Sequence, residues 1–428
     1  MDTMETQSQS QTATAIQTAA QQHHEPTWLI HKRLAALAQM PDLPMPRVQR
    51  FNYRDWAMMP DTFAWRESTP ELADVAASDC QIVQVGQTTV RVNLPEKLQE
   101  QGVILTNIFT AAQDYPDLVQ AAFMTQAIKA NENRLASYHT AYLNAGVFLY
   151  VPDNVIIDQP VDIQLIQDST QDQPLVSHVL AVAGRNAEFS LNQHLTTVGT
   201  NANLANCLLE VVANENSHVT IAALDELGPQ TLAYVERRAY AADNAVINWA
   251  VGFMNEGNTI GNFDTELNGT GAQADAKVIA ITDHDQRMGV NTKITNRGKH
   301  TNGNILQRGV ILEKSELVYN GIGDIIHGAA GSEAGQENRL LMMSSDAHGN
   351  ANPILLIDEN DVLAGHAASV GQVDEQQLYY LMSRGLERAT AERLVIRGFL
   401  GAVLSAIPAK AVRQQLIAII ERKLENGR

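Results

Sequence analysis

The sequence predicts a mainly β protein in which a long solenoid of stacked rungs lies between two α-helical regions. Short runs rich in Val, Ile and Leu recur roughly every ten residues from about residue 140 to 370, separated by Asn, Asp and Gly. Aromatic residues make up only 5% of the chain, and the β segment is long for one sandwich. No strict residue-level repeat is visible, so periodicity alone leaves a sandwich or a barrel open.

Residues 1–25 are predicted to be a disordered tail, because Gln, Thr, Ser and Ala cannot bury enough apolar surface to order it. The pair His23-His24 at its end is expected to be solvated rather than to bind a metal. A mainly helical region is expected over 26–140. It begins with a helix near Trp28, which a Pro-rich linker ends, and it holds a further helix from about residue 117 to 134.

A short β piece is expected within this region at about 82–92, and the solenoid core is expected over 141–371. Its predicted strands are 147–151, 161–165, 179–183, 219–221, 245–249, 277–281, 310–312 and, last, 354–357. A C-terminal helical domain is expected over 372–428. Asp374 and Gln377 form its first N-cap pair, Gly385 ends that helix, and two more helices begin near Thr390 and Pro408.

Composition excludes several classes of protein. The chain has 30 Lys and Arg against 48 Asp and Glu, a net charge of −18, which disfavours binding to nucleic acid or to an anionic membrane. No apolar run approaches a membrane span, and the first residues do not resemble a signal peptide. Cys80 and Cys207 are the only cysteines, so a disulfide scaffold and a self-contained thiolate cluster site are excluded. This cysteine usage fits a reducing cytoplasm.

Motifs of common enzymes are missing. The pair Gly298-Lys299 lacks the rest of a phosphate-binding loop, so this chain is not expected to bind ATP. The string Gly269 to Ala274 matches GxGxxA but runs into a strand-like segment instead of a helix, which argues against a dinucleotide site. Cys207 lies in an apolar run and is expected to be buried.

The second half of the β region is rich in histidine, and a solenoid can align residues that are distant in sequence. His284, His300 and His348 are nevertheless expected to have structural roles. His366 lies among the small residues of Gly365–Gly371, which we expect to form a loop between the last strand and the C-terminal helices. Small neighbours leave its imidazole accessible as an iron or zinc ligand, and a packing role is the alternative.

The C-terminal third resembles a known family. The segments Asp361–Gly371, Asp374–Leu386 and Ile396–Phe399 are similar to the C-terminal signature of the SufB/SufD family, scaffold subunits of the SUF iron–sulfur cluster assembly machine. Further segments that fit are Trp28–Trp56, Arg308–Leu312, Asn338–Met342 and Pro353–Ile357. The resemblance covers most of the chain outside the tail, and it is greater to SufD than to SufB.

This resemblance implies a right-handed parallel β-helix with helical flanks and a complex with a SufB-like scaffold and a SufC-like ATPase, which binds the ATP. The C-terminal helices would dock the ATPase, and Tyr379, Tyr380, Arg384 and Arg397 are the candidate contacts. The alternative for the two tyrosines is that they pack their helix on the β body. The strand near 354–357 is expected to be an exposed edge through which the isolated chain forms a homodimer.

The resemblance also implies a division of ligands between subunits. SufB has a cluster-building cysteine near the position of Glu337–Arg339 and a glutamate after the signature histidine, where this chain has Ala367. His366 is therefore expected to supply one ligand to a transient iron–sulfur cluster shared with a partner, in a non-catalytic role. Alternatives are a SufB-type subunit that builds the cluster itself, a stand-alone homodimer and, in another class, a β-helix enzyme acting on acidic polysaccharide.

Overall fold

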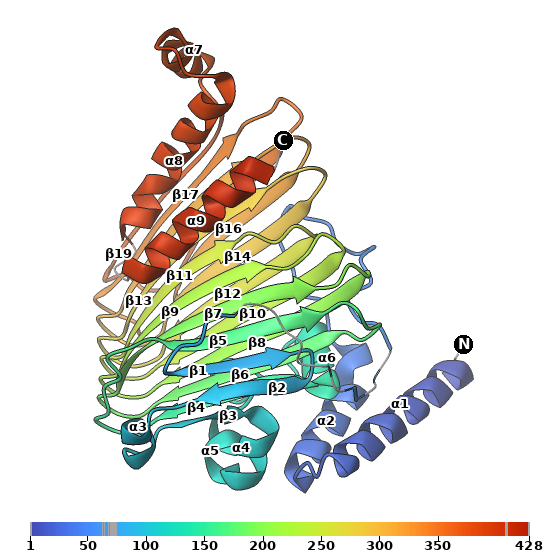
Figure 1. Cartoon of the computed structure of the whole chain (residues 1–428). Coiled ribbons are helices and arrows are strands. Elements are labelled where there is room, and N and C mark those ends of the chain that lie inside the picture. Colours follow the sequence, from blue (N-terminus) through green and yellow to red (C-terminus); the bar gives the residue numbers. More distant parts are fainter. Residues whose placement is uncertain are drawn as a thin grey trace.

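The computed structural model describes residues 2–426 except 62, 64, 67, 69–74 and 407–409. Its centre is a parallel β-solenoid of two facing sheets, with helices at both ends (Figure 1). The predicted mainly β fold and its flanking helices are confirmed, and the sandwich and barrel alternatives are wrong. No helix among these residues is long and apolar enough to cross a membrane.

From β4 onward, successive strands go alternately to the two sheets, and each pairs in parallel with the strand two ahead of it, whereas β2 pairs antiparallel with β1 and β3 antiparallel with β4. The ten-stranded sheet contains β1 (Gln81–Val85), β2 (Thr88–Asn93), β5 (Val161–Asp168), β7 (Glu188–Val198), β9 (His218–Glu226), β11 (Val246–Phe253), β13 (Gln273–Thr282), β15 (Asn302–Ile311), β17 (Ser332–Met342) and β19 (Val362–Gln372). The nine-stranded sheet contains β3 (Ile104–Asn107), β4 (Ala145–Val151), β6 (Leu175–Ala183), β8 (Asn203–Ala213), β10 (Thr231–Ala241), β12 (Thr259–Leu267), β14 (Arg287–Asn296), β16 (Glu316–Ile325) and β18 (His348–Ile357).

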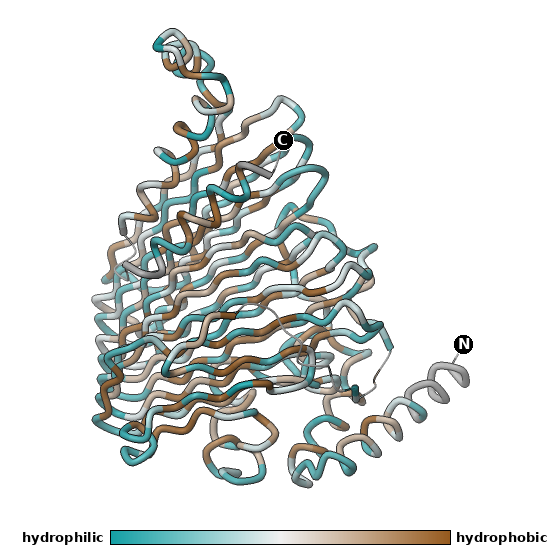
Figure 2. The backbone as a smooth tube through the Cα atoms, in the orientation of Figure 1, coloured by the Kyte–Doolittle hydropathy of each residue, from teal (hydrophilic) through white to brown (hydrophobic). Residues whose placement is uncertain are grey.

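The interior of the solenoid is an apolar core formed by alternate side chains of both sheets. Figure 2 shows hydrophobic segments recurring strand after strand along it. One ion pair is enclosed in this core: the Arg237 guanidinium donates to Asp225, with an Nη1–Oδ2 distance of 3.0 Å, and both side chains are inaccessible. The rings of Phe253 and Phe263 lie 5.5 and 5.3 Å from the guanidinium carbon. The buried charge of the Arg237 guanidinium is therefore balanced by the Asp225 carboxylate.

A column of asparagines marks one corner of the solenoid. Asn154, Asn186, Asn216 and Asn244 have φ between +55° and +63°, a conformation that asparagine adopts more readily than most residues. Each amide after the first donates to the previous Oδ1, at 2.8, 3.1 and 3.1 Å. The ladder thus stabilises successive turns at the same point.

The helices lie at the two ends of the sequence. They are α1 (Asp2–Gln22), α2 (Thr27–Gln39), the 3-10 helix η1 (Met40–Asp42), α3 (Glu96–Glu100), α4 (Ile108–Asp114), α5 (Pro116–Ala122), α6 (Arg134–Tyr142), α7 (Glu375–Ser383), α8 (Arg388–Ala406) and α9 (Lys410–Asn426).

The N-terminal segment corrects the prediction of a disordered tail over residues 1–25. It forms α1, and Ile16 packs with Leu37 of α2 and Tyr138 of α6. The local composition is too polar to order a helix alone, so its order depends on this tertiary contact.

The expected helix over 117–134 is also wrong. α5 ends at Ala122, because Phe123 leaves the helical region and Met124 has φ +53°. A new helix, α6, begins at Arg134, capped by the Asn133 side chain, which accepts from the Ala136 amide at 2.9 Å.

The predicted boundary at residue 141 does not separate two units. β1 pairs in parallel with β5, and β3 pairs with β4, so two earlier strands belong to the solenoid sheets. The linker after α2 lies against the nine-stranded sheet, where Val48 and Phe51 pack with Ile260 and Val318.

The three C-terminal helices begin as predicted, apart from the start near Pro408, which lies outside the described residues. The Asp374 side chain caps α7 by accepting from the Gln376 amide at 2.8 Å, and Gly385 follows the helix with φ +91°. α8 and α9 pack on the outer face of the ten-stranded sheet through an apolar cluster that includes Leu400 and Leu416. α7 projects away from the solenoid (Figure 1).

Candidate functional site

The last turn of the solenoid is open. β18 is the final strand of the nine-stranded sheet and β19 that of the ten-stranded sheet, and nothing in the described part of the chain pairs beyond them. The prediction that residues 354–357 lie at an exposed edge is confirmed, since they end β18. The prediction that they form the last strand is wrong, because β19 follows.

β19 is not predicted from the sequence because small residues, not Val and Ile, dominate it. Its signal is the spacing: β19 begins 30 residues after β17, and Ser332 pairs with Val362 in register to the end of both strands. The strand is formed by hydrogen bonds to β17 rather than by burial of its own side chains, which are mostly exposed.

β19 has none of the features that usually protect a free edge. Its eleven residues include no charged residue and no proline, whereas β18 carries Pro353. Leu363 is 69% exposed and Val370 41% exposed. Uncharged, unpaired edges of this kind are templates for pairing with a strand of another chain, which makes the open end the candidate interaction surface.

His366 lies in the middle of β19, which corrects its expected place in a loop. Its in-register partner is Gln336 of β17, and Gln336 and Asn338 are buried and face the interior. His366 therefore faces the interior side of the open end, where it is exposed and none of the described residues covers it. Its ring forms no hydrogen bond to any residue that the structure describes. It is neither a packed nor a rung-corner histidine, and its ring nitrogens are free to bind a ligand.

The other histidines are not brought to this place. His284 and His300 are turn residues with φ +53° and +55°, and His348 is the first residue of β18. Among the described residues, no three His, Cys, Asp or Glu side chains are grouped so that they could hold a metal ion.

Neither cysteine can act as a thiolate at the open end. Cys80 and Cys207 are buried, and burial raises the pKa of the first thiol to about 11 and of the second to about 12. The expected burial of Cys207 is confirmed.

α7 presents an aromatic surface to solvent. Tyr379 is 75% and Tyr380 56% exposed, so the alternative that they pack the helix on the β body is wrong. Arg384 lies over the Tyr380 ring, 5.1 Å from its centroid, and donates to its hydroxyl at 3.2 Å. Aromatic and arginine side chains of this kind are enriched in protein interfaces.

Arg397 lies apart from this surface. It is on α8, where its Nε is 3.1 Å from the Glu421 carboxylate of α9. The two residues flank a cavity of about 290 Å³ between α8 and α9, whose apolar wall includes Leu404 and Ile417.

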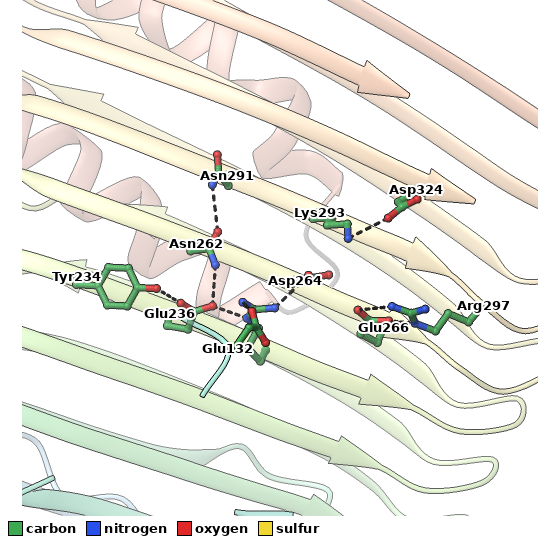
Figure 3. A network of polar contacts seen from close by, with 11 residues as sticks. Glu132, Tyr234, Glu236, Asn262, Asp264, Glu266, Asn291, Lys293, Arg297 and Asp324 are labelled. Atoms are coloured by element: carbon green, nitrogen blue, oxygen red, sulfur yellow. Dashed lines mark hydrogen bonds and ion pairs between the residues drawn. The ribbon is translucent and has the colours of Figure 1, made fainter. Parts of the chain in front are cut away.

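A polar network on the outer face of the nine-stranded sheet is the second candidate site (Figure 3). Arg238 is paired with Glu132, Glu236 and Asp264, and burial raises the pKa of Asp264 to about 7. A cluster of acids and bases on one face is what a polysaccharide-acting solenoid enzyme requires. Here the Arg238 side chain is 6% exposed and joins Glu132, from the loop before α6, to β10 and β12. The network thus fastens the N-terminal region to the solenoid.

Fold and site together define a parallel β-solenoid protein whose last turn ends in an unpaired, uncharged edge strand. Comparison with known proteins gives the family: the model of the SUF system FeS cluster assembly, SufBD core domain matches residues 165–399, and that of the SufBD protein N-terminal region matches residues 74–163. The chain belongs to the SufB/SufD family.

Relatives extend this similarity over nearly the whole chain. The iron–sulfur cluster assembly protein SufD of Bacillus subtilis is 40% identical over 425 residues, which cover 96% of this chain and 97% of that protein. An iron–sulfur cluster assembly SufBD family protein of Staphylococcus haemolyticus is 23% identical, covering 93% of this chain and 90% of its own length. Within the family, the chain is most like SufD.

Proposed function

We propose that the chain is a non-catalytic scaffold subunit for iron–sulfur cluster assembly, and that it contributes His366 to a site completed by a SufB-like partner. The observation that carries the proposal is the combination found on β19: an uncovered, uncharged edge strand with an unpartnered histidine at its centre. Family membership supports the same function.

The ligand chemistry requires a second chain. Iron–sulfur clusters are held mainly by thiolates, with histidine as a minority ligand. Both thiols here are buried and protonated, so this chain supplies at most the bond from His366. A partner strand added to β19 would bring the remaining ligands to the imidazole. The cluster is the cargo of this site and leaves it for other proteins.

The C-terminal helices would dock a SufC-like ATPase. The exposed surface of Tyr379, Tyr380 and Arg384 on α7 is one part of the docking region, and Arg397 beside the cavity between α8 and α9 is the other. ATP is bound by that partner, because this chain lacks a phosphate-binding loop. The complex would work in the cytoplasm, where thiols stay reduced.

The ligand role is tested with His366→Ala. Its ring makes no hydrogen bond and is exposed, so the melting temperature should stay within about 1–2 °C, since exposed substitutions change stability by about 0.5 kcal/mol or less. The cluster yield of the complex should be lost. His348→Ala, an exposed histidine on the neighbouring edge strand, is the matched control and should keep full yield. Full yield from His366→Ala would refute the ligand role.

The edge is tested by sedimentation of the isolated chain, which should form a homodimer at micromolar concentration. Leu363→Lys places a charge on the exposed edge and should give a monomer, while Leu394→Lys, at a 43% exposed position on α8, should not. A wild-type chain that is a stable monomer would contradict the role of the edge.

A further inference from the structure

A column of polar side chains crosses the outer face of the nine-stranded sheet and ends at the open turn. The register of the strands places one residue from each of β10, β12, β14, β16 and β18 in line: Glu236, Asn262, Asn291, Asn320 and Asn352. Register partners in neighbouring strands stand about 4.8 Å apart. Figure 3 shows the first three members of the column. The last member, Asn352, is on the free edge strand of this sheet.

Every amide in the column donates in the same direction, away from the open end. Asn262 Nδ2 donates to Glu236 Oε1 at 2.8 Å, and each later Nδ2 donates to the preceding Oδ1, at 3.2, 2.9 and 2.9 Å. The Glu236 carboxylate is paired with Arg238 and can only accept hydrogen bonds. The direction of the whole column is therefore set by its first member.

The N-terminal linker holds two of the amides in this direction. Asn291 Nδ2 also donates to the Arg47 carbonyl at 2.9 Å, and Asn320 Nδ2 donates to the Gln49 carbonyl at 3.2 Å. A carbonyl oxygen cannot donate, so turning either amide over would break two hydrogen bonds. Asn320 is fully buried, and the direction is thus fixed up to the last strand but one.

Asn352 ends the column with an unused acceptor. Its Nδ2 donates to Asn320 Oδ1, whereas its own Oδ1 accepts no hydrogen bond from any residue that the structure describes. In the three asparagines before it, Oδ1 accepts from the strand that follows in the sheet. The Oδ1 of the half-buried Asn352 therefore faces the place where a further strand would pair with β18. Aligned hydrogen bonds polarise one another, which strengthens this acceptor.

We propose that Asn352 selects the strand that covers β18: the partner strand must place an N–H donor, from an Asn, Gln, Lys or Arg side chain, opposite it. A SufB-like partner that covers the open end would cover β18 together with β19, so this inference rests on the proposed function. An apolar or acceptor-only side chain at that place would leave the Asn352 oxygen unpaired in the interface. Main-chain pairing supplies affinity at such an edge, and the side chain of Asn352 adds specificity.

The test is the affinity of the full chain for a SufB-like partner, measured by titration calorimetry without iron. Asn352→Leu keeps the size of the side chain and removes its acceptor, so the affinity should fall about tenfold, the scale expected for one donor left unpaired in an interface. Asn352→Lys replaces the acceptor with a charged donor and should bind more weakly still. Asn320→Leu does not reach the interface, but it releases Asn352 from its fixed direction and should also weaken binding.

Asn350→Leu and Asn350→Lys are the matched controls. Asn350 lies two residues earlier on the same face of β18, and its register partner is the apolar Val318 instead of an amide. Each control should lower the affinity less than its counterpart at position 352. Wild-type affinity of a folded Asn352→Leu or Asn320→Leu chain would overturn the proposal, and so would tighter binding by Asn352→Lys. A wild-type chain that does not bind the partner at all would overturn the proposed function, and this inference with it.

Discussion

Replacing His139 should make the protein less sensitive to acid, because this residue belongs to a buried chain of titratable groups between α6 and the solenoid. His139 Nε2 lies 3.1 Å from His178 Nδ1, and His178 Nε2 lies 3.3 Å from a Glu210 carboxylate oxygen. All three side chains are fully buried. Burial lowers the pKa of each histidine to about 3 and raises the pKa of Glu210 to about 8.

The direction of the pH dependence of stability follows from whether the folded or the unfolded state binds more protons. Between pH 6.5 and about 3 the unfolded chain protonates each histidine and the folded chain does not, so stability falls as the pH falls, by about 1.4 kcal/mol per pH unit for each. Glu210 acts in the opposite direction: it is protonated only in the folded state between pH 4.5 and 8, so its contribution is lost as the pH rises. From pH 6.5 to 4.5 the three groups together should lower the free energy of unfolding by about 1.4 kcal/mol for each unit by which the pH falls.

His139→Gln removes one of the two histidine contributions. Urea unfolding followed by circular dichroism from pH 4.5 to 6.5 should give a slope of stability against pH that is smaller than the wild-type slope by about 1.4 kcal/mol per unit. His284→Gln, whose side chain is 67% exposed, should leave the slope unchanged. A His139→Gln slope equal to that of the wild type would refute the reasoning.

Three further outcomes follow from the packing. Asp225→Ala leaves Arg237 unpaired in the interior and should destabilise the protein by about 3–5 kcal/mol in urea unfolding, and a loss below 1 kcal/mol would contradict the account. Leu400→Ala should cost about 2–5 kcal/mol and expose α8 to limited proteolysis, and unaltered cleavage would argue against its docking on the sheet. Replacing Tyr379 and Tyr380 by Ala should leave the melting temperature unchanged and reduce ATPase co-purification at least tenfold, and undiminished co-purification would exclude α7 as a docking surface.

The sequence predicts the order of helical region, β-solenoid and helical region, because runs of branched apolar residues mark the strands wherever the solenoid interior is apolar. The stacking of the solenoid turns is also indicated by a repeat in the sequence. Asn154, Asn186, Asn216 and Asn244 recur at spacings of 32, 30 and 28 residues, each at a turn with positive φ. This spacing matches one solenoid turn and distinguishes a solenoid from a sandwich.

Features that depend on contacts between residues distant in sequence could not be predicted. β19 is composed largely of small residues, and its strand conformation comes from its register with β17. α1 is polar in sequence and depends on the contact of Ile16 with α2. His366 was found from its small neighbours and family signature, but its place in the middle of an edge strand was not, because β19 has no pattern of apolar residues.

The central claim is that the assembly site is shared between chains, and reconstitution with ferrous iron and sulfide tests it most directly. The visible absorption of a bound cluster should be stable when a SufB-like partner is mixed with this chain, and it should not survive desalting when this chain is alone. The mixture with His366→Ala should behave like the partner alone. A stable, stoichiometric cluster on the isolated chain would contradict the account.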